Sequence, residues 1–327
     1  MYARPAIALL VCFYGLAEPL NAQAAASSSQ RGTNLASYDW SMKASPNLAA
    51  KPPSMKVLVS FLNLVDSSTG GDGDIGESED DSEHVAYVCS FRFTDLRRNG
   101  SLSLVAGIGV TQRGYCRDVY VVDKTASGFE IYSTGGSAGD GSDVSAKIKD
   151  LRHDGHLEFL LLDDLGEIKL KCAANWTAIY AWTGGGYTNV SEQFKDFYRQ
   201  RLDTINKLIP KLQECCVTEG PSLNDKECLD AEAAKIQRFL GVSPEAGLDQ
   251  AMRLAKSKDP GEREFAASLL GQIATPTAKK FLETLAKDSA GNVAYIAKYC
   301  LAAVAKGGIS DAPADFRLLK QDPVLRH

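Results

Sequence analysis

The side chains best suited to chemistry in this chain are concentrated in an acidic, glycine-rich segment at residues 66–83. This segment holds eight acidic residues and no Lys or Arg. Calcium prefers several carboxylate oxygens on a flexible backbone, so Asp72, Asp74 and Glu77 are the candidate ligands for calcium, the one cofactor that the sequence suggests. The alternative is a solvated loop, because a run of like charges repels itself and cannot be buried. The sequence leaves both interpretations open.

No arrangement of residues predicts catalysis. A G-x-S-x-G motif surrounds Ser137, but a nucleophile elbow needs an apolar strand before the serine and a helix after it, and neither is indicated there. Asp163 and Asp164 are adjacent, so in a strand their side chains would point to opposite faces and could not share a proton. We therefore predict a protein that is not an enzyme, with no catalytic residues.

A group of four aromatic residues is the other candidate binding feature. Exposed, these side chains would form a platform for carbohydrate or peptide; buried, they would be part of a β-sheet core. The group consists of Trp176, Tyr180, Trp182 and Tyr187.

Charge and the N-terminal sequence limit the class of protein. The net charge of -5 argues against nucleic acid as a partner, because phosphate binding needs a concentrated surplus of Lys and Arg. Residues 1–24 combine Arg4, an apolar run at 6–17 and small residues before residue 24, which is typical of a secretory signal peptide. We predict export to the periplasm or the medium, with a retained membrane anchor as the alternative. Residues 25–54 are rich in Ala, Ser, Asn and Pro, which predicts a flexible lead.

The cysteines favour disulfides in an exported protein. Cys116 and Cys172 follow the two copies of an internal repeat at nearly the same spacing, so a bridge between the copies is one option. A local bridge from Cys215 or Cys216 to Cys228 is another. The connectivity stays open, because spacing alone does not determine it.

The internal repeat organises the first half of the chain. Residues 95–105 return as residues 150–160, with five of eleven positions identical and no gap. Apolar segments flank both copies, which predicts two small antiparallel sheets, each containing an Asp-Gly turn. We expect a β domain over 55–189 whose strands cover 56–65, 85–94, 102–110, 115–122, 129–132, 146–149, 157–162, 167–172 and 177–182.

The pattern becomes helical after residue 189. A second repeat appears with a spacing of 31 residues: Leu254-Ala255-Lys256 returns as Leu285-Ala286-Lys287. Two helices in each 31 residues are typical of a helical-hairpin repeat. Ser243-Pro244, Asp259-Pro260 and Thr275-Pro276 each place a capping oxygen before a proline, which predicts three helix starts. We expect a helical domain over 190–310, then a C-terminal tail at 311–327.

The β-domain loops resemble the calcium-binding D-x-D-x-[DN]-G loops of FG-GAP and VCBS-type β-propeller blades. The matching residues are Asp95, Asn99 and Gly100 in the first copy and Asp150, Asp154 and Gly155 in the second. In this family a second carboxylate stands where this chain has Arg97 and Arg152. A guanidinium close to a divalent ion is strongly repelled, so we expect each arginine either to replace the cation or to turn outward. The resemblance implies a partial β-propeller-like domain.

The segment 243–306 resembles short HEAT-type repeats, whose arrays bind protein partners along a groove; a plain helical bundle is the alternative. The fold class expected is thus β followed by α. We expect an exported, non-enzymatic interaction or scaffold module with a protein partner, bound first by the helical groove and then by the aromatic group. A secreted calcium-dependent or carbohydrate-binding protein is the second interpretation, and a hydrolase the third.

Overall fold

A computed structural model describes residues 34–80, 83–110, 115–134, 143–163, 176–215, 223–306 and 316–322. The predicted signal peptide, the Ser137 motif, Asp164 and the strand expected at 167–172 lie outside these ranges. Most of the β-strands in the described chain come before a series of helices, as the sequence predicted, although a helix at Met55–Ser68 precedes the strands and a strand at Arg317–Asp322 follows the helices.

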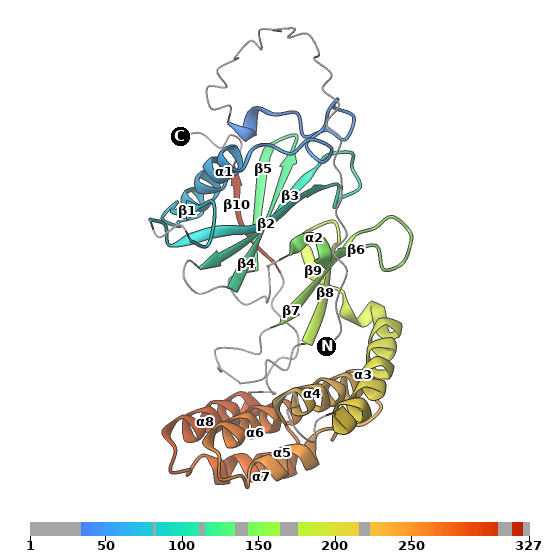
Figure 1. The fold of residues 1–327 in the computed structure, drawn as a ribbon, viewed down its shortest axis with the longest axis vertical. Coiled ribbons are helices and arrows are strands. Elements are labelled where there is room, and N and C mark those ends of the chain that lie inside the picture. Colours follow the sequence, from blue (N-terminus) through green and yellow to red (C-terminus); the bar gives the residue numbers. More distant parts are fainter. Residues whose placement is uncertain are drawn as a thin grey trace, which may run out of the picture. The chain divides into compact units, whose positions relative to one another are not determined.

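The first repeat unit forms most of a six-stranded sheet. Its strands β2 (Ala86–Thr94), β3 (Ser103–Val110), β4 (Tyr115–Thr125) and β5 (Gly128–Ser133) form an antiparallel meander, confirming the four strands expected there. Two further strands complete the order β1-β2-β3-β4-β5-β10 (Figure 1). They are β1 (Ile75–Gly76), parallel to β2, and β10 (Arg317–Asp322), antiparallel to β5.

The second repeat unit forms a four-stranded sheet of the same plan. Its strands β6 (Ile148–Lys149), β7 (Glu158–Asp163), β8 (Trp176–Trp182) and β9 (Tyr187–Asn189) are antiparallel and follow one another in sequence order. A short helix, α2 (Val144–Lys147), takes the first two residues of the strand expected at 146–149, and β6 is formed by the other two. In both sheets the repeated loop joins the first strand of the meander to the second, so the sequence repeat is a structural repeat.

The strand expected at 56–65 is wrong, because these residues belong to helix α1 (Met55–Ser68). The segment is apolar enough to fit either the two-residue repeat of a strand or the 3.6-residue repeat of a helix. Its buried residues follow the helical spacing of three and four: Leu58, Phe61, Leu62 and Val65. They pack in one cluster with the six-stranded sheet, so the tertiary contact selects the helix.

The flexible lead expected at 25–54 is also wrong for its described part. Leu35, Trp40 and Leu48 are buried, and a 3-10 helix, η1 (Leu35–Ser37), precedes the tryptophan. The Trp40 ring contacts Phe61 and Phe93 with ring centroids 5.8 and 5.6 Å apart. A few large apolar anchors within a small-residue segment are sufficient to dock it, and average composition conceals them.

Both faces of the six-stranded sheet are covered. Leu104 and Val122 pack with α1, whereas Val105 and Val121 point to the opposite face and share a core with Phe159 of the second sheet. This is the alternation that strand geometry imposes.

The C-terminal tail expected at 311–327 contains an ordered strand instead. Strand β10 pairs with β5, and Phe316 just before it is buried against Phe159 and Tyr180. The backbone N–H of Phe316 donates to the carbonyl of Tyr187 at 3.2 Å. Residues 316–322 are thus part of the β domain, and Phe316 lies in its core.

Six helices and a short 3-10 helix follow β9 in the described ranges. Asp259 and Thr275 cap α6 and α7 with their side chains, confirming two of the three helix starts. The start expected at Ser243-Pro244 is wrong, because a turn follows it and α5 begins at Leu248, after Gly247 with a φ of 86°. The elements are η2 (Ser191–Phe194), α3 (Lys195–Cys215), α4 (Leu223–Phe239), α5 (Leu248–Leu254), α6 (Pro260–Ile273), α7 (Pro276–Leu285) and α8 (Gly291–Ala305).

The helical repeat is visible in the packing. Hairpin α5–α6 corresponds to hairpin α7–α8, and residues 31 apart are buried in one cluster, including Leu254 with Leu285 and Ala266 with Ala297. The 31-residue spacing therefore reflects two helical hairpins with a shared core.

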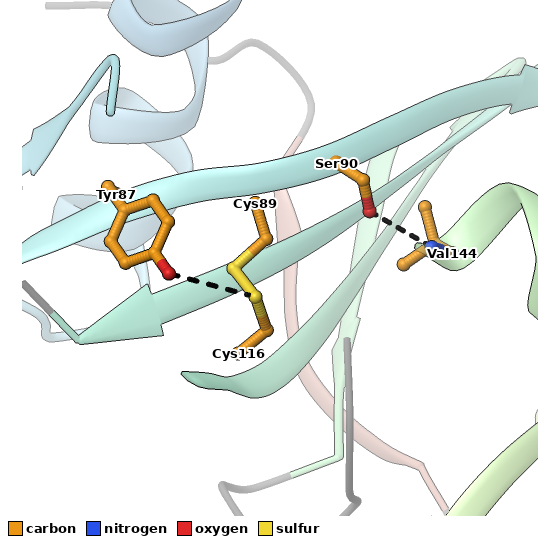
Figure 2. Close-up of a disulfide and its surroundings, with 5 residues drawn as sticks. All are labelled: Tyr87, Cys89, Ser90, Cys116 and Val144. Carbon is orange, nitrogen blue, oxygen red and sulfur yellow. Dashed lines mark hydrogen bonds between the residues drawn. A yellow bond between two sulfur atoms is a disulfide. The ribbon is translucent and has the colours of Figure 1, made fainter. Parts of the chain in front are cut away.

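A disulfide joins Cys89 of β2 to Cys116 of β4, two strands that lie on either side of β3 (Figure 2). Such strands are ordinarily about 10 Å apart, yet the two Cα atoms are 6.2 Å apart. Register shifts occur in both ladders here, and the bridge passes over Gly109 of β3. This pairing excludes the expected Cys116–Cys172 bridge.

The bridge predicts a strict requirement for glycine at position 109. A Cβ atom there would lie 2.5 Å from the Tyr87 ring and 2.8 Å from the Cys89 sulfur. We expect Gly109→Ala to lower the free energy of unfolding by about 1–3 kcal/mol, because neither neighbour can withdraw without disturbing the sheet. Urea unfolding of the oxidised protein measures this. Gly185→Ala is the control, since its added methyl meets nothing within 4 Å, and equal losses in both variants would contradict the prediction.

Candidate functional site

The two repeated loops have the same hydrogen bonds. Asp95 accepts from the backbone N–H groups of Asn99 and Gly100, and Asp150 accepts from those of Asp154 and Gly155, all at 2.9–3.1 Å. The residue before Asn99 or Asp154 has a positive φ in each copy, 54° at Arg98 and 57° at His153. Each aspartate thus stabilises its own turn by accepting hydrogen bonds from backbone donors.

The Arg97 side chain points away from the first loop and is part of a buried ionic cluster. Its guanidinium donates to Asp123 at 2.8 Å and to Glu130 at 2.5 Å, and its Cζ lies 3.8 Å from the centre of the Trp182 ring. The Tyr187 hydroxyl donates to the Asp123 carboxylate at 2.9 Å. Arg97 comes from the first repeat unit and the two aromatic rings from the second, so the cluster joins the two sheets.

The charges in this cluster are strongly coupled. Burial raises the pKa of Asp123, and Arg97 is the largest opposing influence. The pKa of Tyr187 lies well above its ordinary value, mainly through burial and then through Asp123. The Arg97 side chain is 11% exposed and that of Asp123 2%, so removal of either charge would leave the other buried without its partner.

Arg152 occupies the same loop position in the second copy and has different surroundings. Its guanidinium donates to the Gln193 side-chain carbonyl at 2.5 Å, and its Cζ lies 4.5 Å from the centre of the Phe194 ring. Within the described ranges Arg152 forms no ion pair, and its side chain is exposed. Both arginines therefore stack on an aromatic ring from a later part of the chain, but of the two only Arg97 binds carboxylates.

The sequence predicted that each arginine would either replace the cation or turn outward. Arg152 is exposed and lies over Phe194, which fits the outward orientation, whereas the Arg97 side chain turns inward to Asp123 of another strand and fits neither. Asp123, the partner of Arg97, was not predicted from the sequence. A signal was present, because Asp123 follows Val119 and Val121 at a spacing of two, and these valines face the core. A carboxylate on a buried strand face requires a cationic or hydrogen-bonding partner.

The candidate calcium ligands are not brought together. The Asp74 carboxylate is 2.6 Å from His84 Nδ1, which lowers the pKa of Asp74, and it also accepts from the Val85 N–H. Asp72 and Glu77 do not join it, and the described residues contain no group of three or more His, Cys, Asp or Glu able to hold a metal ion. In this part of the chain the acidic segment ends α1 and anchors β1.

The aromatic platform is contradicted where the side chains are described. Tyr180 and Tyr187 are each 1% exposed, and Trp182 packs between Tyr187 and Arg97. The Trp176 side chain lies outside the described set. These rings are in the core because alternate residues of β8 and the start of β9 face the first sheet. Burying large aromatic side chains stabilises the fold more than leaving them exposed to water.

The remaining cysteines are only partly described. Cys228 is disulfide-bonded, and its partner lies outside the described side chains, as do Cys172, Cys215 and Cys216. Cys300 is free and buried in α8, where burial raises the pKa of its thiol to about 11. It is therefore a packing residue rather than a nucleophile.

Among the described helices, α8 has a conspicuous exposed surface. Tyr295 and Tyr299 are 68% and 59% exposed and lie one turn apart on the same side of the helix. A separate groove of about 530 Å³ lies where α3, α4 and α5 meet, and Asp230, Glu245 and Asp249 line it. The helical groove expected from the sequence could correspond to either of these two surfaces.

Comparisons with protein families, with characterised proteins and with solved structures find no match to this chain. The resemblances to propeller blades and to HEAT repeats therefore remain predictions. None of the helices in the described ranges has the length and apolar sequence that a membrane span requires.

Proposed function

We propose that this protein is an exported, non-enzymatic interaction module that binds a protein partner through its helical domain. In this proposal the two meanders are a partial, propeller-like scaffold, and the hairpins α5–α6 and α7–α8 are a HEAT-like array. The observation that supports it best is the exposed tyrosine pair on α8.

The repeat explains why this face should have a partner. Ser268 and Gly271 of α6 are buried, and α6 packs against both helices of the following hairpin. The residues 31 positions later are Tyr299 and Ala302 of α8, and both are exposed. Terminal repeats that face only solvent usually have a polar outer face. A pair of tyrosines there is instead typical of a protein interface, where Tyr is enriched.

Photo-crosslinking in the exporting cell tests this proposal. A photoreactive phenylalanine at position 299 should yield one discrete adduct with a partner protein, and the double variant Tyr295→Ser/Tyr299→Ser should fail to retain that protein. Position 242 is the control, because Val242 is 69% exposed but lies in the turn after α4. No adduct at 299, or the same adducts from both positions, would refute the proposal.

A further inference from the structure

We propose that Arg152 is a binding site for carboxylate groups of an acidic peptide segment in a protein partner. The inference comes from the internal repeat, because the first copy shows what the same arginine position binds. Arg97 stacks on Trp182 and holds the two carboxylates of Asp123 and Glu130. Arg152 stacks on Phe194 in the same manner, and among the described residues its guanidinium hydrogen-bonds only to the amide oxygen of Gln193.

Strand register shows which residues of the second sheet occupy the positions of Asp123 and Glu130 in the first. In the first sheet Ser103, eight residues after Asp95, pairs with Asp123, which pairs with Glu130. In the second sheet Glu158, eight residues after Asp150, pairs with Ala181, which pairs with Thr188. The two carboxylates that Arg97 binds therefore correspond to Ala181 and Thr188, which carry no charge.

Glu158 does not replace them. Its carboxylate is turned to its own loop, where it accepts from the Leu151 N–H at 3.0 Å. Burial is the largest influence on the pKa of Glu158 and raises it; Arg152 opposes this at longer range, without an ion pair. The outer side of the Arg152 guanidinium thus remains available, and a planar guanidinium binds a carboxylate through two parallel hydrogen bonds.

A groove of about 750 Å³ adjoins Arg152, between the second loop and the start of α3. The acidic residues of its wall are already engaged: Asp150 by its own loop, Glu192 by Lys195 at 3.3 Å, and Asp196 by Arg199 at 2.5 Å. Lys149 and His153 line the same groove, are exposed and have no ion-pair partner in the described chain. Four Lys or Arg residues and three acidic residues line the groove, so its formal charge is positive with His153 taken as neutral.

These features select the ligand. A carboxylate fits the bidentate geometry of Arg152, and the additional cation Lys149 favours several acidic side chains along an extended peptide rather than a single small acid. This site is independent of the α8 face, since it is built from the second repeat loop, η2 and the start of α3.

Fluorescence polarisation with a labelled octapeptide of alternating Glu and Gly tests the site in the full-length oxidised protein. We expect saturable binding at about 0.15 M salt, where long-range attraction is screened. Arg152→Gln should weaken binding about tenfold, the effect typical of a charge-assisted hydrogen bond. Lys298→Gln removes one charge on α8 and should change the affinity less than about twofold, because exposed charges at a distance are screened. The variant Tyr295→Ser/Tyr299→Ser should bind the peptide normally, which separates this site from the proposed function.

Three outcomes would overturn the proposal. The first is equal affinity of the Arg152→Gln variant and the unmodified protein for the peptide. The second is equally tight binding of a control peptide with Gln in place of Glu, which would show that carboxylates are not recognised. The third is self-association of the protein in sedimentation that Arg152→Gln abolishes, which would assign the site to a second copy of this chain.

Discussion

Arg97→Gln is expected to lower the free energy of unfolding by about 3–5 kcal/mol, the range found when one partner of a buried ion pair is removed. The substitution would leave the buried carboxylate of Asp123 without its cation and would remove the stacking on Trp182. It would also break a contact between the two sheets. Equilibrium unfolding in urea measures the loss, and Trp182 fluorescence reports the local change.

The repeat provides a matched control for Arg97. Arg152→Gln makes the same chemical change at the equivalent loop position, but the side chain is exposed and forms no ion pair within the described chain. We expect it to change stability by less than about 1 kcal/mol, as for other surface charges. Similar losses for the two substitutions would show that the ionic cluster does not stabilise the fold as the geometry indicates.

Phe316→Ala is expected to lower the free energy of unfolding by about 3 kcal/mol, at the lower end of the range for replacing a buried phenylalanine by alanine. The Phe316 ring is 6% exposed and contacts Phe159, Tyr180 and Tyr187. The cost is limited because β10 is an edge strand near the end of the chain and can detach while the other five strands remain paired.

Limited proteolysis distinguishes this from a general loss of stability. Trypsin should cleave at Arg317 or Lys320 sooner in Phe316→Ala than in the unmodified protein, while cleavage elsewhere changes little. Leu319→Ala is the control, because Leu319 is 40% exposed on the same strand. An unchanged cleavage rate in Phe316→Ala would mean that the ring does not hold β10 in place.

The different surroundings of Arg97 and Arg152 suggest how the repeat has been used. Both copies keep the loop geometry and the aromatic ring beneath the arginine. In the first copy the carboxylate partners come from the same chain and stabilise it. In the second copy, according to our proposal, they come from another protein. This gives the repeat one structural site and one binding site.

Local features could be predicted from the sequence. The Asp-Gly turns depend on hydrogen bonds over four and five residues. The repeat alone therefore indicated that Asp95 and Asp150 have the same role in their turns. The strands of the first meander follow from alternation, and the α6 and α7 starts follow from an oxygen before proline. The 31-residue spacing likewise predicted the hairpins, because equivalent residues 31 positions apart are buried in both of them.

The sequence by itself therefore determined the order β then α, the repeated turns and the helical hairpins, all of which depend on contacts between residues close in the chain. Only the tertiary structure decided the helix at α1, the Cys89–Cys116 pairing, the burial of Tyr180 and Tyr187, and the different partners of Arg97 and Arg152. Each of these depends on which distant segment covers a given side chain. For an amphipathic or charged residue, the local sequence is compatible with both a buried and an exposed side chain. The segment that packs against the residue decides between the two.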